Sequence, residues 1–252
     1  MMTTMKSKTQ TALIVSCAAV LVTVILLLVA KFAVMPAKAN TDIQQIQSLY
    51  SETKSAPISS TSSAMAAKQD SGRIAALKKI NKDIQGWITV PGTKINYPVL
   101  QSGKEQPEHY LKYNFKNARS DYGSIFMQTG CNPATSRNTV VYGHNMLDGS
   151  MFRGLLQYDS TDFCKKNPCF FYEDSHGKKT YQVFAVIKEK SGFTRTDFTD
   201  DLDFATFVRE LQENSIYDTG VTADGWDHIM LLCTCSYEAK DNRTVVAGKL
   251  VH

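Results

Sequence analysis

The chain of 252 residues has few prolines and glycines and only one long apolar segment, and each of these features excludes a class of protein. It contains only 7 prolines and 14 glycines, too few for a collagen-like fibre. It has one long apolar run, which excludes a multi-span membrane protein. Hydrophobic residues make up 43% and charged residues 21%, the balance of a chain that folds. The length therefore fits one ordinary domain with an appendage, or two small domains.

Acidic residues are absent from the first 39 positions, and this accounts for the formal net charge of +4. Lys6, Lys8, Lys31 and Lys38 lie in that segment, so residues 40–252 carry 24 basic and 24 acidic side chains. Because the basic excess is confined to one end, the rest of the chain offers no excess of positive charge to a polyanion. We therefore expect no nucleic-acid partner.

The apolar run extends from Ala12 to Ala30 without a charge. As a helix it would span about 30 Å, the thickness of one hydrocarbon core. Two interpretations remain open: an uncleaved signal-anchor, or a signal peptide cleaved near the Ala-Lys-Ala at 37–39. The run is longer than the roughly 7–15 apolar residues of a signal peptide, which favours the anchor. We expect residues 1–11 in the cytoplasm, a transmembrane signal-anchor over 12–34, and a single-pass cell-membrane protein.

The composition changes after the apolar run. Ile43, Ile46, Leu49 and Tyr50 would line one side of a short helix. The residues that follow are rich in Ser, Ala and Thr and lack apolar periodicity, which is typical of a flexible spacer. We expect a flexible extracellular stalk over 35–70 and a globular domain over 71–252.

The globular part alternates short β-like runs with turn signals. Helices are expected from a cap at Ser71, from a cap at Ser150, and over residues 201–214. Many strands and few helices predict a mainly β domain, an antiparallel barrel or a sandwich. The expected strands are 87–90, 95–101, 124–128, 138–144, 169–174, 180–189, 228–235 and 243–251.

The chain has six cysteines, and their number and spacing limit what they do. Cys17 lies in the apolar run and is either inert or acylated. The other five cannot all pair with one another; Cys164 and Cys169 either form a local disulfide or are free thiols. A structural zinc site takes four nitrogen or sulfur ligands. We interpret Cys233 and Cys235 as facing opposite sides of a strand, so that they do not converge on one ion, and we expect no metal.

Three expected strand ends carry candidate catalytic groups. Cys235 ends one apolar run, and Arg243 opens the next after a seven-residue polar loop. A guanidinium beside a thiol favours the thiolate. His144 ends a third run. The three residues can meet as a Cys–His–Arg site, although on spacing alone a strand-end histidine is more often structural and an arginine at a strand start is usually a solvated charge.

Besides these three residues, the sequence contains several longer motifs. Residues 231–235 read Leu-Leu-Cys-Thr-Cys, and residues 142–145 read Tyr-Gly-His-Asn. The segment 80–101 reads INKDIQGWITVPGTKINYPVLQ, and Arg243 follows the cysteine motif. Over 71–252 the chain resembles the class B sortases, membrane-anchored cysteine transpeptidases of Gram-positive bacteria whose cysteine motif is TLxTC.

The resemblance implies a mainly β fold, a closed eight-stranded barrel with N-terminal and inter-strand helices, preceded by one transmembrane helix. It implies Cys235 as nucleophile, His144 as general acid/base and Arg243 as substrate clamp and oxyanion stabiliser, without a cofactor. The enzyme would cleave an LPxTG-like or NPxTN-like sorting motif after its Thr and join the protein to a cell-wall peptide amine. Its partners would be sorting-motif-bearing surface proteins, a peptidoglycan precursor or wall peptide, and the membrane.

The resemblance also suggests substrate-binding residues, with two departures from the family pattern. Leu111 and Phe193 are candidates for the groove, although either could be a core residue. Thr234 and Cys233 belong to the cysteine motif, where Cys233 replaces a residue that is often serine. A thiol donates a hydrogen bond weakly, so specificity at this position is expected to differ. The motif begins with Leu231 in place of threonine.

Three other functions remain open at this point. A pilus-polymerising sortase would use a pilin lysine as its acceptor amine. An exported cysteine protease would use water, but papain-like enzymes place Cys before His, and the caspase signature QACxG is absent. A non-catalytic, membrane-tethered binding module would not depend on Cys235.

Overall fold

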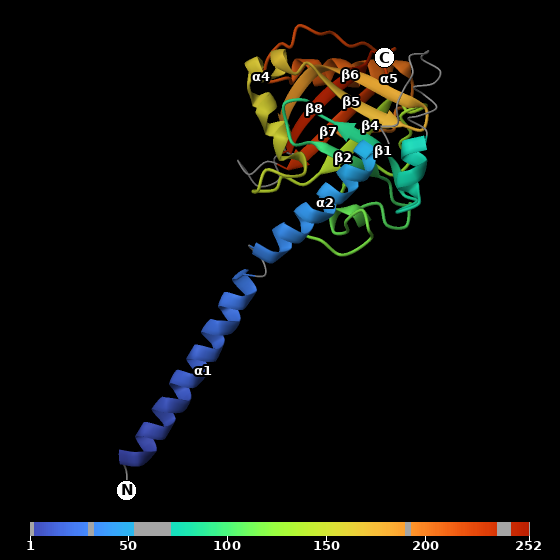
Figure 1. The fold of residues 1–252 in the computed structure, drawn as a ribbon. Coiled ribbons are helices and arrows are strands. Elements are labelled where there is room, and N and C mark those ends of the chain that lie inside the picture. Colours follow the sequence, from blue (N-terminus) through green and yellow to red (C-terminus); the bar gives the residue numbers. More distant parts are fainter. Residues whose placement is uncertain (1–2, 30–32, 53–71, 190–192, 236–242, 252) are drawn as a thin grey trace. The chain divides into compact units, whose positions relative to one another are not determined.

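The computed structural model describes residues 3–29, 33–52, 72–189, 193–235 and 243–251 (Figure 1). The chain divides into two compact units, Met1–Ile46 and Gln47–His252.

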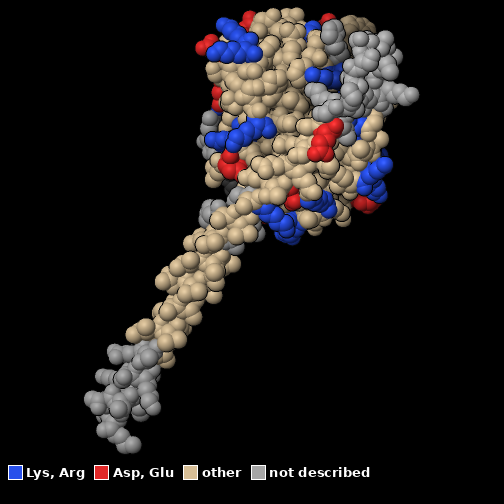
Figure 2. Space-filling model, viewed as in Figure 1, with Lys and Arg blue, Asp and Glu red and all other residues tan. Residues whose placement is uncertain are grey.

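The first unit is helical. Helix α1 spans Thr3–Val29, and helix α2 spans Met35–Glu52 and continues into the second unit. The window Ala12–Val29 has a mean hydropathy of 3.1 and is fully exposed, so α1 is long and apolar enough to cross a membrane. The space-filling view shows the corresponding segment without charged side chains, whereas both signs are interspersed over the visible face of the second unit (Figure 2). The expected N-terminal apolar helix is confirmed.

The end of α2 is part of the second unit and packs on its sheet. The ring of Tyr50 stacks on Trp87 with centroids 4.0 Å apart, and its hydroxyl donates to Glu173 Oε2 at 2.7 Å. Arg73 Nη2 lies 3.1 Å from Glu173 Oε1, and both side chains are less than a tenth exposed. The helix expected around residues 43–50 is therefore present, and its last turn is held by ring stacking and by a hydrogen bond to the carboxylate of a buried ion pair. The rest of the expected stalk, and the Ser71 cap, lie outside the described residues.

The second unit is built around a barrel of β-strands (Figure 1). The barrel is closed, and its strand order is β1-β2-β3-β4-β7-β8-β6-β5. Pairings β2·β3 and β4·β7 are parallel and the others are antiparallel. Each strand overlaps one of the eight expected runs, and the predicted barrel is confirmed. The strands are β1 Ile84–Thr89, β2 Asn96–Leu100, β3 Ile125–Met127, β4 Asn138–Gly143, β5 Cys169–Asp174, β6 Gly177–Glu189, β7 Ile229–Cys235 and β8 Arg243–Leu250.

Apolar side chains cover both faces of the central strands, which is why these strands read as continuous hydrophobic runs. In β7, Ile229, Leu231 and Cys233 pack in a cluster with helix α5, Asp201–Glu213. Met230 and Leu232 alternate with them and are also fully buried. Helix α5 begins at the Asp200 cap, whose side chain accepts from the backbone of residue 203. Its apolar side fixes β7 from one face.

Shorter helices complete the unit, and here the sequence reading was less accurate. Residues 72–78 are helical, and η2, His109–Leu111, is a single 3-10 turn. The helix expected from Ser150 is the 3-10 helix η3, Phe152–Asp159. Ser150 does not cap it; its hydroxyl instead donates to Asp148 Oδ1 at 2.6 Å. Helix α4, Thr161–Lys166, was not predicted and is capped by the Ser160 side chain.

Cys164, inside α4, and Cys169, the first residue of β5, are free thiols. Cys164 is buried, and Cys169 is partly exposed. Burial raises the pKa of both thiols. The alternative of a Cys164–Cys169 disulfide is therefore not realised in the structure.

Candidate active site

The candidate catalytic residues meet at one end of three adjacent strands. Strand β4 runs parallel to β7, and its last pair is Gly143 with Thr234. His144 directly follows the first member of this pair and Cys235 directly follows the second. On its other edge β7 is antiparallel to β8, which pairs Cys235 with Arg243. The strand register thus places the backbone of Cys235 beside Arg243 on one neighbouring strand and level with His144 at the end of the other.

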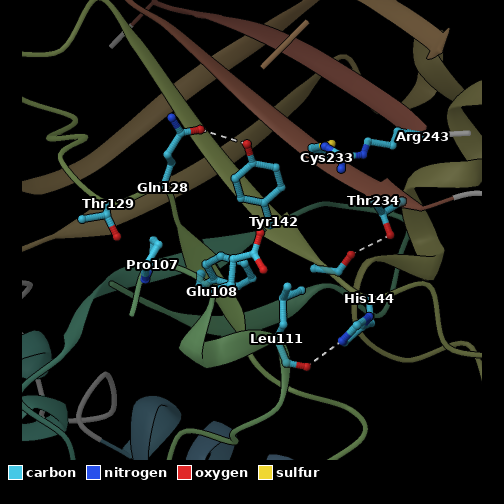
Figure 3. A pocket seen from close by; sticks show the side chains of 12 residues that line it. Pro107, Glu108, Leu111, Gln128, Thr129, Tyr142, His144, Cys233, Thr234 and Arg243 are labelled. Atoms are coloured by element: carbon cyan, nitrogen blue, oxygen red, sulfur yellow. Dashed lines mark hydrogen bonds between the residues drawn. The ribbon is translucent and has the colours of Figure 1, made fainter. Parts of the chain in front are cut away.

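A buried hydrogen bond holds these strand ends together. Thr234 is 2% exposed, and its Oγ1 donates to the carbonyl oxygen of Gly143 at 2.6 Å (Figure 3). Gly143 itself is enclosed, because a Cβ there would lie 2.7 Å from the Phe152 ring and would also overlap the Ile125 side chain. Only glycine lets β4 lie this close to the Ile125 and Phe152 side chains, so packing requires the glycine that precedes His144.

A groove of about 440 Å³ opens at this end of the barrel (Figure 3). His144 and Arg243 both line it, and Glu108 contributes a carboxyl group. Its wall combines apolar and aromatic side chains with a few polar groups, as in sites that bind an extended peptide or a small molecule. The lining residues are Pro107, Glu108, Leu111, Phe126, Gln128, Thr129, Tyr142, Gly143, His144, Cys233, Thr234 and Arg243.

The imidazole of His144 is oriented by a backbone group. Its Nε2 lies 2.8 Å from the carbonyl oxygen of Leu111, in the η2 turn (Figure 3). His144 is partly exposed, and its backbone carbonyl accepts from the Phe152 N–H at 2.8 Å. Ring and backbone are therefore both anchored while one side of the ring faces the groove.

Tyr142 forms a polar network across the wall of the groove. Its hydroxyl donates to Gln128 Oε1 at 2.9 Å (Figure 3). Gln128 Nε2 in turn donates to Thr196 Oγ1 at 2.8 Å. Burial raises the pKa of Tyr142, although Thr194 and the nearby Arg243 act in the opposite direction. The phenol therefore stays protonated and serves as a fixed donor. The sequence did not predict Tyr142 and Gln128 as site residues, although Tyr142 lies inside the Tyr-Gly-His-Asn motif.

The predicted substrate residues fall into two groups. Leu111, Thr234 and Cys233 line the groove. Phe193 is not part of the groove lining; it is half-buried and packs against the α5 cluster. Glu108 and Pro107 line the groove from a polar loop that gave no signal in the sequence.

The expected orientation of the cysteine pair was wrong. Side chains alternate along a strand, so positions two apart share a face of the sheet. Position 235 therefore belongs to the same face as Cys233, Leu231 and Ile229. The side chain of Cys235 lies outside the described part of the structure. Among the side chains that are described, no group of three His, Cys, Asp or Glu could hold a metal ion.

Comparison with known proteins identifies the fold and the family. Residues 88–251 match the Sortase domain family model. Sortase B of Listeria monocytogenes is 38% identical over 180 residues, covering 69% of this chain and 72% of the relative. Sortase B of Staphylococcus aureus is 38% identical over 181 residues, covering 70% and 73%.

Solved structures agree with the sequence relatives. The Staphylococcus aureus sortase B–substrate complex superposes with a TM-score of 0.75 at 30% identity, covering 87% of this chain and 99% of that one. A sortase B complexed with triglycine gives 0.75 at 31% identity, covering 86% and 98%. The closed barrel and its groove thus define a sortase fold. The chain belongs to the class B branch of the sortase family, and it is a cysteine transpeptidase.

Proposed function

We propose that this sortase cleaves an LPxTG-like or NPxTN-like sorting motif after its threonine and joins the new carboxyl end to an amine of a cell-wall peptide. Cys235 is the nucleophile, His144 the general acid/base and Arg243 the oxyanion stabiliser and substrate clamp. The observation that carries the proposal is the strand register, which pairs Cys235 with Arg243 and sets it one position beyond the Gly143–Thr234 pair.

The first half-reaction breaks the peptide bond. The Cys235 thiolate attacks the threonine carbonyl carbon and forms a C–S bond, and the carbonyl oxygen takes up negative charge. The Arg243 guanidinium stabilises this oxyanion because it is a fixed cation with several donors. As the C–N bond breaks, His144 gives its proton to the leaving amine. The products are a thioester on Cys235, a released peptide with a free amine, and a neutral imidazole.

The second half-reaction resolves the thioester. The acceptor amine attacks the same carbonyl carbon, His144 takes the proton that the amine loses, and the C–S bond breaks. A new amide bond results, and the thiolate and the imidazolium are regenerated. Dividing amide exchange into two steps avoids direct attack of one amine on a stable amide. Arg243 acts in both halves, because the same oxygen becomes negative each time.

The groove supports an extended peptide substrate. Leu111 and Phe126 offer apolar contact on its wall, while Tyr142 and Thr129 offer polar groups. Cys233 lies where the groove meets the α5 cluster and is 1% exposed. We assign Leu111, Thr234 and Cys233 to substrate binding. A substrate-binding role for Phe193, which lies between β6 and α5 in the sequence, remains a prediction.

Helix α1 supports a single-pass membrane anchor with the catalytic domain outside the cell. Its apolar window has the length of one hydrocarbon core, and Lys6 and Lys8 favour a cytoplasmic N-terminus. Substrates and wall precursors at the same membrane face would then meet the enzyme at a raised effective concentration.

A ligation assay tests the proposal. The full chain in detergent is incubated with a library of sorting-motif peptides and with triglycine, free lysine amide or no amine, and products are identified by mass spectrometry. We expect cleavage after threonine and a triglycine-linked product, both absent in Cys235→Ala. Triglycine is chosen because a sortase B has been solved in complex with it. Exclusive ligation to lysine would favour pilus assembly, hydrolysis without ligation would favour a protease, and unimpaired turnover by Cys235→Ala would exclude the mechanism.

A further inference from the structure

The hydrogen bond to the backbone carbonyl of Leu111 makes the two ring nitrogens of His144 chemically different. A carbonyl oxygen only accepts hydrogen bonds, so the contact of 2.8 Å with Nε2 requires a proton on that nitrogen. This holds for the neutral ring and for the imidazolium alike. Nε2 therefore keeps its proton and donates it in a hydrogen bond to the η2 turn, so Nδ1 is the nitrogen that can accept or release a proton.

The carbonyl is held in place by the turn around it. The Leu111 N–H donates to the Glu108 carbonyl at 3.0 Å, which closes η2. The preceding residue, Tyr110, is buried; its hydroxyl donates to Asp83 Oδ2 at 2.8 Å, and its carbonyl accepts from Ser124 N–H at 2.9 Å. The turn is thus fixed both to the start of β1 and to the start of β3.

Gly123 packs directly against this turn. Its φ is +56°, in the left-handed region that favours glycine. A Cβ at this position would lie 2.5 Å from the Tyr110 carbonyl oxygen and 2.7 Å from the Leu111 carbonyl oxygen. Both neighbours are backbone atoms, so a methyl group fits only if the η2 turn moves. Moving it displaces the acceptor that orients His144.

We propose that Gly123 is a positioning residue for the general acid/base. By letting the chain pass against η2, it holds the Leu111 carbonyl so that His144 keeps Nε2 protonated and exchanges its proton through Nδ1. This inference rests on the proposed role of His144. Leu111 would then connect substrate binding with the general acid/base. Its side chain lines the groove, and its backbone carbonyl orients the His144 ring.

The nitrogen assignment is tested without turnover. Full chain carrying Cys235→Ala is labelled with ¹⁵N-histidine, and His144 is assigned by the signals that His144→Gln removes. In the neutral ring we expect the ¹⁵N shifts to show the proton on Nε2 and none on Nδ1. A neutral ring protonated on Nδ1 would overturn the inference, whatever the enzyme turns out to ligate.

The role of Gly123 is tested with a matched pair of variants. Gly123→Ala meets the η2 backbone, whereas Gly220→Ala has a similar φ of +74° and nothing within 4 Å of the added methyl. We expect Gly123→Ala to lower kcat/KM for ligation about 100-fold, the cost of misplacing a catalytic group by about 1 Å. In its spectrum the neutral ring should become a mixture of the two tautomers, and Gly220→Ala should match the wild type in both readouts.

Two outcomes would refute the role of Gly123. One is wild-type ligation by Gly123→Ala. The other is a loss of ligation with the His144 tautomer unchanged, which would mean that the turn acts on substrate alone. If Gly123→Ala does not fold, the ¹⁵N spectrum of the Cys235→Ala protein still decides which nitrogen of the neutral ring carries the proton. If wild-type protein does not ligate any peptide, the proposed function fails, but the nitrogen assignment is still measured.

Discussion

Replacing Thr234 by valine tests whether the hydrogen bond between β7 and β4 holds the site together. Valine has nearly the same shape as threonine but lacks the hydroxyl that donates to the Gly143 carbonyl at 2.6 Å. Thr234→Ser keeps the hydroxyl and removes only a methyl group. The two variants therefore separate the loss of the hydrogen bond from the loss of volume.

The expected effect on stability follows from burial. Thr234 is 2% exposed, so water cannot replace the lost donor, and an unsatisfied buried acceptor costs about 1–3 kcal/mol. For a unit the size of Gln47–His252, each kcal/mol lowers Tm by roughly 2–4 °C. We therefore expect Thr234→Val to melt about 2–12 °C below wild type. Thr234→Ser should lose less, because the hydrogen bond remains.

The effect on activity follows from the register. The Gly143–Thr234 pair immediately precedes His144 and Cys235, so loosening it changes the distance between imidazole and thiol. We expect kcat/KM for ligation to fall about 10- to 100-fold in Thr234→Val, at a temperature where the variant is folded. Thermal unfolding followed by circular dichroism and a fluorescence ligation assay provide both numbers. Wild-type stability and activity in Thr234→Val would refute the reasoning.

Three further substitutions probe other parts of the account. Arg243→Lys should reduce kcat about 100- to 1,000-fold in the ligation assay, since one ammonium does not reproduce the guanidinium fork; activity within a few-fold of wild type would remove Arg243 from its role. Gly143→Ala should cost about 1–3 kcal/mol of unfolding free energy in urea titrations, because the methyl group overlaps buried side chains, whereas Gly103→Ala, with nothing within 4 Å, should be near neutral. Glu173→Gln should destabilise the protein by about 3–5 kcal/mol, because it removes one charge of the buried Arg73–Glu173 ion pair, and an unchanged urea midpoint would contradict this.

The strands were predictable because buried strands carry continuous apolar runs. Val140 and Val141 in β4, and Leu231 and Leu232 in β7, are fully buried and stand out in the sequence. Closure into a barrel was not predictable from periodicity, because a sandwich has the same alternation; it came from the family resemblance. The parallel β4·β7 pairing joins segments about 90 residues apart, and no local pattern records it.

Local backbone geometry was harder to foresee. The η2 turn lies in a polar segment without periodicity, yet it supplies the Leu111 carbonyl that orients His144. Ser150 looked like a helix cap, but its hydroxyl bonds to Asp148 in the turn before η3. Tyr50 was expected only on a short helix, whereas its stacking on Trp87 depends on tertiary structure. Each of these depends on contacts between distant segments, which sequence spacing does not encode.

The central claim is that the Cys235 thiol becomes acylated, and intact-mass analysis tests it directly. The full chain is mixed with a sorting-motif peptide in the absence of an acceptor amine and quenched in acid after short times. The account predicts a mass increase equal to that of the peptide fragment ending at threonine less one water, located on Cys235 by fragmentation and discharged by added triglycine. An adduct on Cys233, or ligation that proceeds at full rate in Cys235→Ala, would contradict it.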